Sequence, residues 1–161
     1  MIPEALDLAT ELASRSGFDC LHDPNKATEM IEAYHDPVGF PTQGYGRLLS
    51  RVKWEDLSKY PPISVEQAKA DLQVDIRRAA RSAHRLIKVS LEPKQWAAIY
   101  DFCFNCGAGN LQGSVLLARI NREEFDGVPE QLMRFVYASS VKLKGLVRRR
   151  AAEVRMWEGG V

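Results

Sequence analysis

The fifteen residues Ala33–Arg47, which read AYHDPVGFPTQGYGR, constrain the fold of this 161-residue chain more than any other stretch. Pro and Gly at positions 37–39 supply turn chemistry, because proline fixes φ and glycine accepts a positive φ. Residues suited to extended backbone stand on both sides, and Gly44-Tyr45-Gly46 then lets the chain bend sharply. The pattern predicts a β-hairpin in a sequence that is otherwise mostly helical.

The hairpin contains one carboxylate and one hydroxyl, Asp36 and Thr42, with the turn between them. Side chains on facing strands can meet at this separation. A carboxylate and a hydroxyl that converge beside a glycine-lined bend can hold a water molecule. The alternative is that Asp36 caps the turn and that Thr42 is an ordinary strand residue.

The hairpin resembles the signature of the phage-type lysozymes, or endolysins, of glycoside hydrolase family 24. Their hairpin reads A-Y-x-D-x-x-G-x-x-T-x-G-Y-G, and every fixed position of this pattern is present from Ala33 to Gly46. The resemblance covers most residues after about Glu29. It implies a mainly α (α+β) lysozyme-like fold with two lobes, in which a long helix joins a small β-hairpin lobe to a helical lobe.

The same resemblance implies a chemistry, namely hydrolysis of the β-1,4 bond between N-acetylmuramic acid and N-acetylglucosamine in peptidoglycan. Asp36 and Thr42 would position the attacking water, with inversion at the sugar. Inverting enzymes hold their two carboxyl groups roughly 6.5–9.5 Å apart, which leaves room for that water. No metal and no organic cofactor is required. The residues that would bind the glycan are Tyr34, Gly44, Tyr45 and Asn105.

The proton donor of this family is a glutamate that directly precedes a glycine at the end of the first helix. Here the matching helix end reads Arg15-Ser16-Gly17-Phe18, so the glycine is present and the glutamate is not. Counting back from Asp36 by the family's usual spacing reaches Ala27, which is not an acid either. The sequence therefore leaves the identity of the acid open.

A substitute acid would have to come from the carboxylates near the hairpin, which are Glu29, Glu32, Asp23, Asp19 and Glu11. We choose Glu29, because it lies just before the first strand and can swing into a cleft. A general acid at neutral pH needs a raised pKa, which partial burial beside apolar groups supplies. The alternative for each of these residues is a solvated surface carboxylate.

The chain is predicted to form one lysozyme-like domain, with capping signals at two helices. Pro3 and Gly17 suit the two ends of the first helix, and Ser64-Val65-Glu66-Gln67 is a capping box. Residues 47–62 are polar and turn-rich, and Trp54 among them either stacks on a sugar ring or packs in the core. The predicted parts of domain 1–161 are the first helix 1–17, the β-hairpin lobe 29–62, the connecting helix 64–88 and the helical lobe 91–161.

Apolar spacing predicts the helices of the helical lobe. A mostly apolar helix from Leu91 to Phe104 would be its buried centre, and the phrase F-N-x-G-x-G at its end resembles the family's cleft floor, where Asn105 faces substrate. The further helices expected are Ser114–Asn121 with a serine cap, Pro129–Ala138, which Ser139-Ser140 ends, and a final helix that includes Leu146–Val154.

Three cysteines are an odd number, which argues against a disulfide scaffold and for a protein made in a reducing cytosol. Cys103 and Cys106 form a single C-x-x-C pair, so two buried free thiols are favoured over a redox or metal site. No apolar run approaches ~18 residues, and the N-terminus lacks the pattern of a signal peptide, so we expect neither a membrane span nor export. The family resemblance adds that such a protein leaves the host cytoplasm through a membrane pore and then acts on the wall.

Basic residues concentrate near the C-terminus, although the net charge is only +1. Residues 142–155 contain six Lys or Arg against Glu153 alone, and G-L-x-x-R-R-x-A-E is a common close of these lysozymes. The cluster Arg148-Arg149-Arg150 could bind a polyanion, whether peptidoglycan, nucleic acid or lipid headgroups. The alternative is a solvated helix face with one or two internal ion pairs.

Three functional hypotheses follow from the sequence. The first is an active muramidase whose acid is Glu29. The second is a catalytically impaired lysozyme-like protein that only binds peptidoglycan, and the third is a basic module that binds polyanions. The resemblance favours the glycan strands of peptidoglycan as the partner of a monomeric protein, with no nucleic acid involved.

Overall fold

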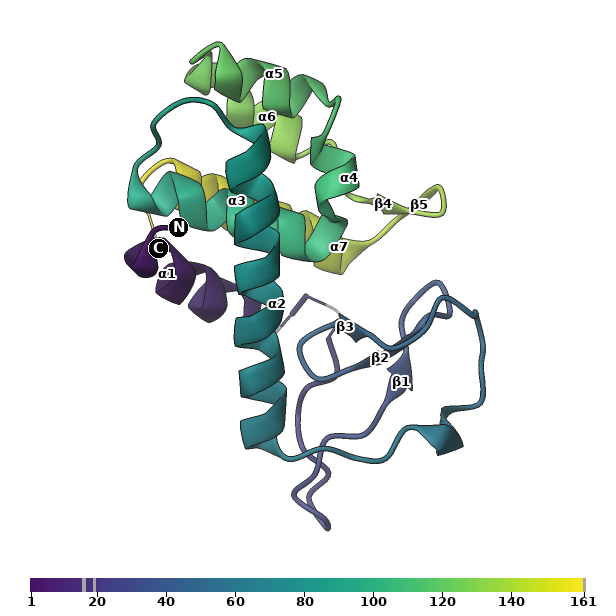
Figure 1. The fold of residues 1–161 in the computed structure, drawn as a ribbon. Coiled ribbons are helices and arrows are strands. Elements are labelled where there is room, and N and C mark those ends of the chain that lie inside the picture. Colours follow the sequence, from purple (N-terminus) through teal and green to yellow (C-terminus); the bar gives the residue numbers. More distant parts are fainter. Residues whose placement is uncertain (16, 19, 161) are drawn as a thin grey trace. The chain divides into compact units, whose positions relative to one another are not determined.

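The computed structural model describes residues 1–15, 17–18 and 20–160 of the chain (Figure 1). These residues form two compact units. The hairpin unit is Asp19–Asp75, and the helical unit combines Met1–Phe18 with Ile76–Val161. Helices dominate and the sheets are small and antiparallel, which confirms the prediction of a mainly α (α+β) chain.

The sheet of the hairpin unit has three strands in the order β1-β2-β3. The strands are β1 (Tyr34–His35), β2 (Pro41–Gln43) and β3 (Arg47–Leu48). The predicted hairpin is β1 and β2, in which Tyr34 pairs with Thr42. The third strand was not predicted, and it arises because Gly44 and Gly46 take φ values of +65° and +95° and so reverse the chain tightly enough for Arg47 to pair with Gln43.

Gln43 ties this sheet to the segments that surround it. The Gln43 side chain is 6% exposed, and its Nε2 donates to the carbonyl oxygens of Ile31 and Pro61, each at 3.1 Å. Ile31 and Ile63 also form an isolated antiparallel bridge. A short 3₁₀ helix, η1 (Leu57–Lys59), lies between β3 and this bridge. The small unit is therefore held by backbone pairing and one buried amide as well as by apolar contact.

The long helix α2 spans Val65–Leu86, within the predicted range. Its 22 residues correspond to ~33 Å at ~1.5 Å per residue. Ser64 Oγ accepts a hydrogen bond from Gln67 N at 3.0 Å, as expected of a helix N-cap. The capping box was only half right, because the Gln67 side chain donates to Asp71 Oδ1 at 2.8 Å.

The helical unit is built around α3 (Pro93–Cys106), which packs against α1 (Pro3–Ala13) and α7 (Lys144–Trp157). Every residue of α3 from Trp96 to Cys103 is buried, which confirms its predicted place at the centre of the core. The remaining elements of this unit are α4 (Ala108–Leu111), α5 (Val115–Asn121), η2 (Phe125–Gly127), α6 (Val128–Leu132), β4 (Tyr137–Ala138) and β5 (Val141–Lys142).

The predicted helix Pro129–Ala138 is wrong in its second half. Helix α6 ends at Leu132, and Tyr137–Ala138 instead forms β4, which pairs with β5. Ser139 and Ser140 take φ values of +48° and +68°, and positive φ at both central residues defines the tight turn of a two-residue β-hairpin. The serine cap of α5 is confirmed, since Ser114 Oγ accepts from Leu117 N at 3.0 Å.

Among the residues that the structure describes, none of the helices combines the length and the apolar character that crossing a membrane demands.

Candidate active site

Asp36 lies at the start of the turn between β1 and β2, where backbone groups hold its carboxylate. Its Oδ1 accepts hydrogen bonds from Val38 N at 3.0 Å and from Phe40 N at 2.8 Å. The backbone N–H of Asp36 donates to Phe40 O at 2.9 Å. No described residue donates a hydrogen bond to Oδ2, and the residue is only half-buried. One carboxylate oxygen is thus fixed, and the other is free to accept a proton.

Thr42 lies on β2 directly opposite Tyr34 of β1, so these two side chains lie on the same face of the sheet. Thr42 is 5% exposed, and its Oγ1 donates a hydrogen bond to Phe40 O at 2.8 Å. A hydroxyl whose proton is used in this way keeps its lone pairs, so Thr42 can still accept a hydrogen bond from water.

The two predicted catalytic side chains therefore meet at one residue. Asp36 binds the N–H of Phe40, and Thr42 binds the carbonyl of Phe40. The sequence offered turn capping by Asp36 as the alternative to a catalytic role. The carboxylate does cap the turn, but this occupies only Oδ1, so capping does not exclude the chemistry.

Trp54 covers the same turn from outside. The backbone N–H of Trp54 donates to Gly39 O at 2.8 Å, and a Cβ atom added to Gly39 would lie 2.6 Å from Trp54 Cε2. The indole packs at 5.2 Å from the His35 ring and is 66% exposed, so the core role considered for Trp54 is wrong. Trp54 lies against the turn that positions Asp36, with most of its surface open to solvent.

The predicted glycan-binding residues of the hairpin unit pack closely. Tyr34 is half-buried, and burial raises the pKa of its hydroxyl above the ordinary value. Tyr45 is 9% exposed and stacks on His22 with the ring centroids 4.5 Å apart. Gly44 lies against α2, where an added Cβ would be 3.3 Å from Ala68 Cβ. Their contact with glycan stays a prediction.

Glu29 lies in the loop before the hairpin, in the same unit as Asp36. It is exposed, takes a φ of +57°, and donates its N–H to Asn25 O at 2.7 Å. Ser16, where the family glutamate is expected, lies outside the described residues. Gly17 is described and has a φ of +87°, but α1 ends at Ala13 with Ser14 as its C-cap, so the helix stops short of the predicted end at residue 17. The assignment of Glu29 as the acid stays a prediction.

Asn105 is exposed at the end of α3. Two of the C-terminal arginines, Arg149 and Arg150, lie in the same unit. Arg149 and Arg150 are 1% and 0% exposed, and both point into the core. Arg149 forms a bidentate pair with Asp101 at 2.9 and 2.7 Å. Arg150 donates to Asn105 Oδ1 and to Glu153 Oε1, each at 2.7 Å. The hypothesis of a basic polyanion-binding cluster is therefore wrong for these two residues, because neither guanidinium is available to a partner.

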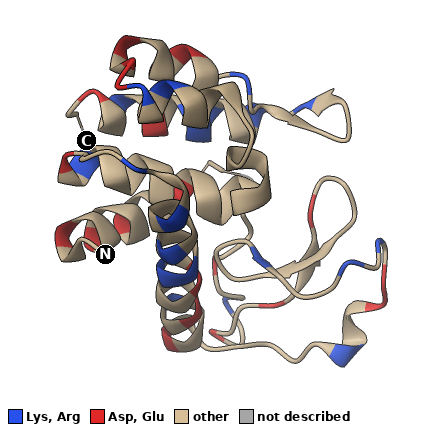
Figure 2. Cartoon of the chain, turned by 45° about the horizontal axis from the view of Figure 1, so that its top comes forward, with Lys and Arg blue, Asp and Glu red and all other residues tan. Residues whose placement is uncertain are grey.

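The basic residues of α2 lie at the surface. Lys and Arg recur along α2 (Figure 2), and the side chains of its four arginines are exposed, namely Arg77, Arg78, Arg81 and Arg85.

The C-x-x-C pair consists of free thiols, as predicted. Burial raises the pKa of Cys103 to about 12, so this thiol stays protonated at neutral pH. Burial also raises the pKa of Cys106, although Arg150 opposes the shift. Within the described part of the chain, no three His, Cys, Asp or Glu side chains cluster as metal ligands would. Neither cysteine has the thiolate character that metal binding or nucleophilic attack requires.

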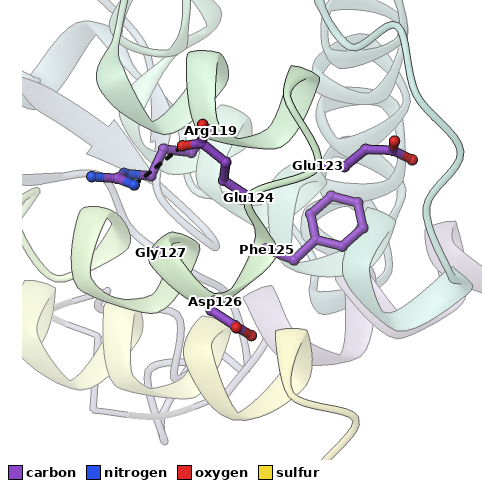
Figure 3. A pocket seen from close by; sticks show the side chains of 6 residues that line it. All are labelled: Arg119, Glu123, Glu124, Phe125, Asp126 and Gly127. Carbon is purple, nitrogen blue, oxygen red and sulfur yellow. Dashed lines mark hydrogen bonds and ion pairs between the residues drawn. The ribbon is translucent and has the colours of Figure 1, made fainter.

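A surface hollow of about 520 Å³ lies in the helical unit, and it is not part of this site (Figure 3). Its charged groups include Glu123 and Asp126, and an ion pair joins Arg119 to Glu124 at 3.2 Å. Phe125 and Gly127 complete the lining. None of the predicted site residues lines this hollow.

Comparison with known proteins decides the family. Residues 28–153 match the family model described as Phage lysozyme. The chain belongs to the phage lysozyme family. It is 35% identical over 126 residues to a SAR-endolysin of Bacteriophage PS34, which covers 77% of this chain and 72% of that protein. It is also 31% identical over 132 residues to an endolysin of Acyrthosiphon pisum secondary endosymbiont phage 1, across 80% of this chain and 86% of that one.

Solved structures show the fold of this phage lysozyme family member to be lysozyme-like. An endolysin from Escherichia coli O157:H7 phage FAHEc1 superposes with a TM-score of 0.70 at 24% identity, covering 97% of this chain and 91% of that one. The muramidase domain of SpmX from Asticaccaulis excentricus also has a TM-score of 0.70, at 23% identity, covering 92% and 93%. Family membership places the chain among the peptidoglycan-degrading glycoside hydrolases. The family match begins at residue 28, after the helix end where the glutamate is missing.

Sequence reasoning missed two parts of this site. Trp54 packs on Gly39, which lies far from it in the sequence, and no local sequence pattern predicts this contact. The inward direction of Arg150 had a signal, because Arg150 and Glu153 are three residues apart on a helix and can pair.

Proposed function

We propose that this protein is an inverting muramidase, which hydrolyses the β-1,4 bond between N-acetylmuramic acid and N-acetylglucosamine during host-cell lysis. The observation that carries the proposal is that Asp36 and Thr42 both bind the backbone of Phe40, within the segment that matches the family. Asp36 Oδ2 and the Thr42 hydroxyl are the acceptors that would hold one water between them.

In the proposed reaction, this water attacks the anomeric carbon as Asp36 takes its proton. The bond from the anomeric carbon to the leaving oxygen breaks, and a separate acid donates the proton that this oxygen needs. The backbone donors on Asp36 Oδ1 keep the carboxylate from turning, so Oδ2 stays directed at the water. Tyr34, Gly44 and Tyr45 would shape the glycan site on the hairpin unit.

We assign the acid to Glu29, which is exposed and belongs to the same unit as Asp36. Its position just before the bridge of Ile31 with Ile63 supports this assignment, because the loop is anchored there and the side chain is free to approach bound glycan.

A second candidate function is peptidoglycan binding without hydrolysis. One observation favours it: the helix end at Ser16-Gly17 lacks the glutamate that the family uses as its proton donor. Such a protein would retain the glycan site and lose the chemical step.

One experiment separates the two functions. The loss of turbidity of purified cell walls is measured for the parent, Asp36→Asn, Glu29→Gln and Ser16→Glu. Lysis by the parent that both Asp36→Asn and Glu29→Gln abolish supports the proposed enzyme with Glu29 as its acid. An inert parent that gains lysis from Ser16→Glu would overturn it and leave the binding function.

We further propose that the protein acts as a monomer, is made in the host cytoplasm and reaches the wall through a membrane pore. A lytic protein that crosses the membrane before the pore opens would contradict this route. Fractionation of expressing cells, with and without a pore-forming partner, measures it.

A further inference from the structure

The contact of Asn105 with Arg150 determines which way the Asn105 amide faces. The two amide ends of an asparagine look alike, but an arginine has only donors. The atom that lies 2.7 Å from Arg150 Nη2 must therefore be the carbonyl oxygen, Oδ1. The thiol of Cys106, a second donor, also faces this oxygen at 3.6 Å. The amide nitrogen, Nδ2, must point the other way.

The Asn105 amide nitrogen is unengaged and open to solvent. Asn105 is exposed at the C-terminal end of α3, and Nδ2 makes no hydrogen bond to any described residue. The side chain therefore presents two N–H donors outward while its oxygen is held from behind. A group arranged in this way recognises an acceptor oxygen and rejects a donor.

Burial and hydrogen bonds fix the direction of the Arg150 side chain. Its side chain is 0% exposed, and Nη2 also donates to Glu153 Oε1 at 2.7 Å. Nη1 donates to Cys106 Sγ at 2.5 Å, and the guanidinium lies 5.2 Å from the centre of the Phe102 ring. A buried charge is a costly way to stabilise a core, since well-packed apolar residues often do as well or better. The guanidinium of Arg150 donates hydrogen bonds to both Glu153 and the exposed amide of Asn105, which an apolar residue cannot do.

We propose that Arg150 is a positioning residue, which turns the Asn105 amide so that its nitrogen donates to an acceptor oxygen of bound peptidoglycan. The inference rests on the proposed function, because it requires that the chain bind peptidoglycan. The acceptor is a carbonyl of the glycan or of its peptide stem. Glu153 completes the arrangement by accepting a second hydrogen bond from the same atom, Arg150 Nη2.

The test compares two neighbouring buried arginines. Arg150→Lys keeps the charge but loses the planar fork, so a single ammonium cannot hold Cys106, Glu153 and Asn105 in their present geometry. Arg149→Lys breaks the bidentate pair with Asp101 in the same helix and leaves Asn105 untouched. Binding is measured by co-sedimentation with intact purified walls, with Asp36→Asn present in every protein to prevent lysis. The melting temperature of each variant is measured in parallel.

We expect Arg150→Lys to weaken wall binding by about tenfold, the size of one lost hydrogen bond. Arg149→Lys should lower the melting temperature and leave binding by the folded protein unchanged. Combined with Asn105→Ala, the Arg150→Lys change should add no further loss, because the amide that it positions is gone. Equal losses from the two lysine variants, or additive losses in the double variant, would overturn the positioning role.

Asn105→Asp tests the direction of the amide without disturbing the core. The aspartate still accepts from Arg150 but presents oxygen where the asparagine presents N–H. We expect about tenfold weaker wall binding with the melting temperature maintained. Unchanged binding would overturn this inference alone, since the parent would still bind walls. A parent that does not bind walls would overturn the inference together with the proposed function.

Discussion

Asp36 and Asp101 are both aspartates held by a pair of hydrogen bonds, yet the two sites have opposite consequences. Backbone N–H groups grip one oxygen of Asp36 in a half-buried turn, and the other oxygen stays open. Arg149 grips both oxygens of Asp101, which is 0% exposed. A carboxylate that does chemistry needs one free oxygen and access to solvent, whereas a structural carboxylate needs a counter-charge. The same replacement at each position tests this difference.

Asp36→Asn should cause the largest change in activity. The asparagine oxygen still accepts from Val38 and Phe40, so the turn should persist, but the side chain no longer takes a proton. We expect wall lysis to fall by about 10²–10⁴-fold, the usual contribution of a general base. The melting temperature should stay near that of the parent. Lysis retained at the parent's rate would mean that Asp36 is only a turn cap.

Asp101→Asn should have the reverse profile. The change leaves Arg149 buried without a full counter-charge, and breaking a buried pair in this way costs about 3–5 kcal/mol of unfolding free energy. Urea unfolding measures the loss. Lysis per folded molecule, measured at low temperature, should match the parent. A variant that is stable but inactive would contradict the structural role.

The sequence predicted the turn of the hairpin unit better than it predicted the buried charges of the helical unit. The turn between β1 and β2 is local, so a few neighbouring residues, namely Asp36, Pro37 and Gly39, are enough to predict it. Burial of a charge is not local. Nothing in the run of three arginines says that Arg149 faces inward, because its partner Asp101 lies on another helix.

The same reasoning explains the other errors in the predicted fold. Strand β3 has only two residues and depends on the bend at Gly44–Gly46, so its sequence carries no strand pattern of its own. The hairpin of β4 and β5 is equally short, and Ser139 and Ser140 end a helix as readily as they form a turn. Long periodic elements such as α2 and α3 were predicted well, because a stripe over many turns cannot be mistaken.

Gly39→Ala should have a smaller effect, on the turn itself. Gly39 has a φ of +100°, and an added Cβ would lie 2.6–2.9 Å from three atoms of the Trp54 ring. Strain of this kind costs ~1–3 kcal/mol, and a shift of the turn would also move Asp36 and slow lysis. Gly109→Ala is the control, because nothing lies within 4 Å of its Cβ position. Adding Trp54→Ala should relieve the clash but not the cost of positive φ, so full recovery would contradict the backbone part of this explanation.

Glu153→Gln should have the smallest effect, measured as the change in unfolding free energy for each pH unit. This variant sharpens the contrast between buried and accessible carboxylates. Glu153 is 0% exposed, and burial, aided by the negative charge of Asp101, raises its pKa well above the ordinary 4.5. Its Oε2 faces no donor among the described residues, and its side chain is hydrogen-bonded to Asp101, so a proton on Glu153 joins the two carboxyl groups. Burial pushes the pKa of Asp101 upward, but Arg149 outweighs it and holds that pKa below the ordinary 3.8.

The sign of the pH effect follows from these two directions. Above about pH 4.5 the unfolded chain loses the Glu153 proton while the folded protein keeps it, so the folded state binds more protons. Stability therefore falls as pH rises toward the raised pKa of Glu153, by at most ~1.4 kcal/mol per pH unit. Asp101 acts in another pH range, because its contribution to stability is lost only as pH falls below 3.8.

The Glu153→Gln variant removes the effect of Glu153 alone. Its melting temperature should therefore rise relative to that of the parent between pH 5 and pH 8, by about 2–4 °C for each kcal/mol of unfolding free energy. Exposed Glu158→Gln is the control, and its curve should run parallel to the parent's. Parallel curves for Glu153→Gln as well would mean that Glu153 is ionised in the core, with Arg150 as its full counter-charge.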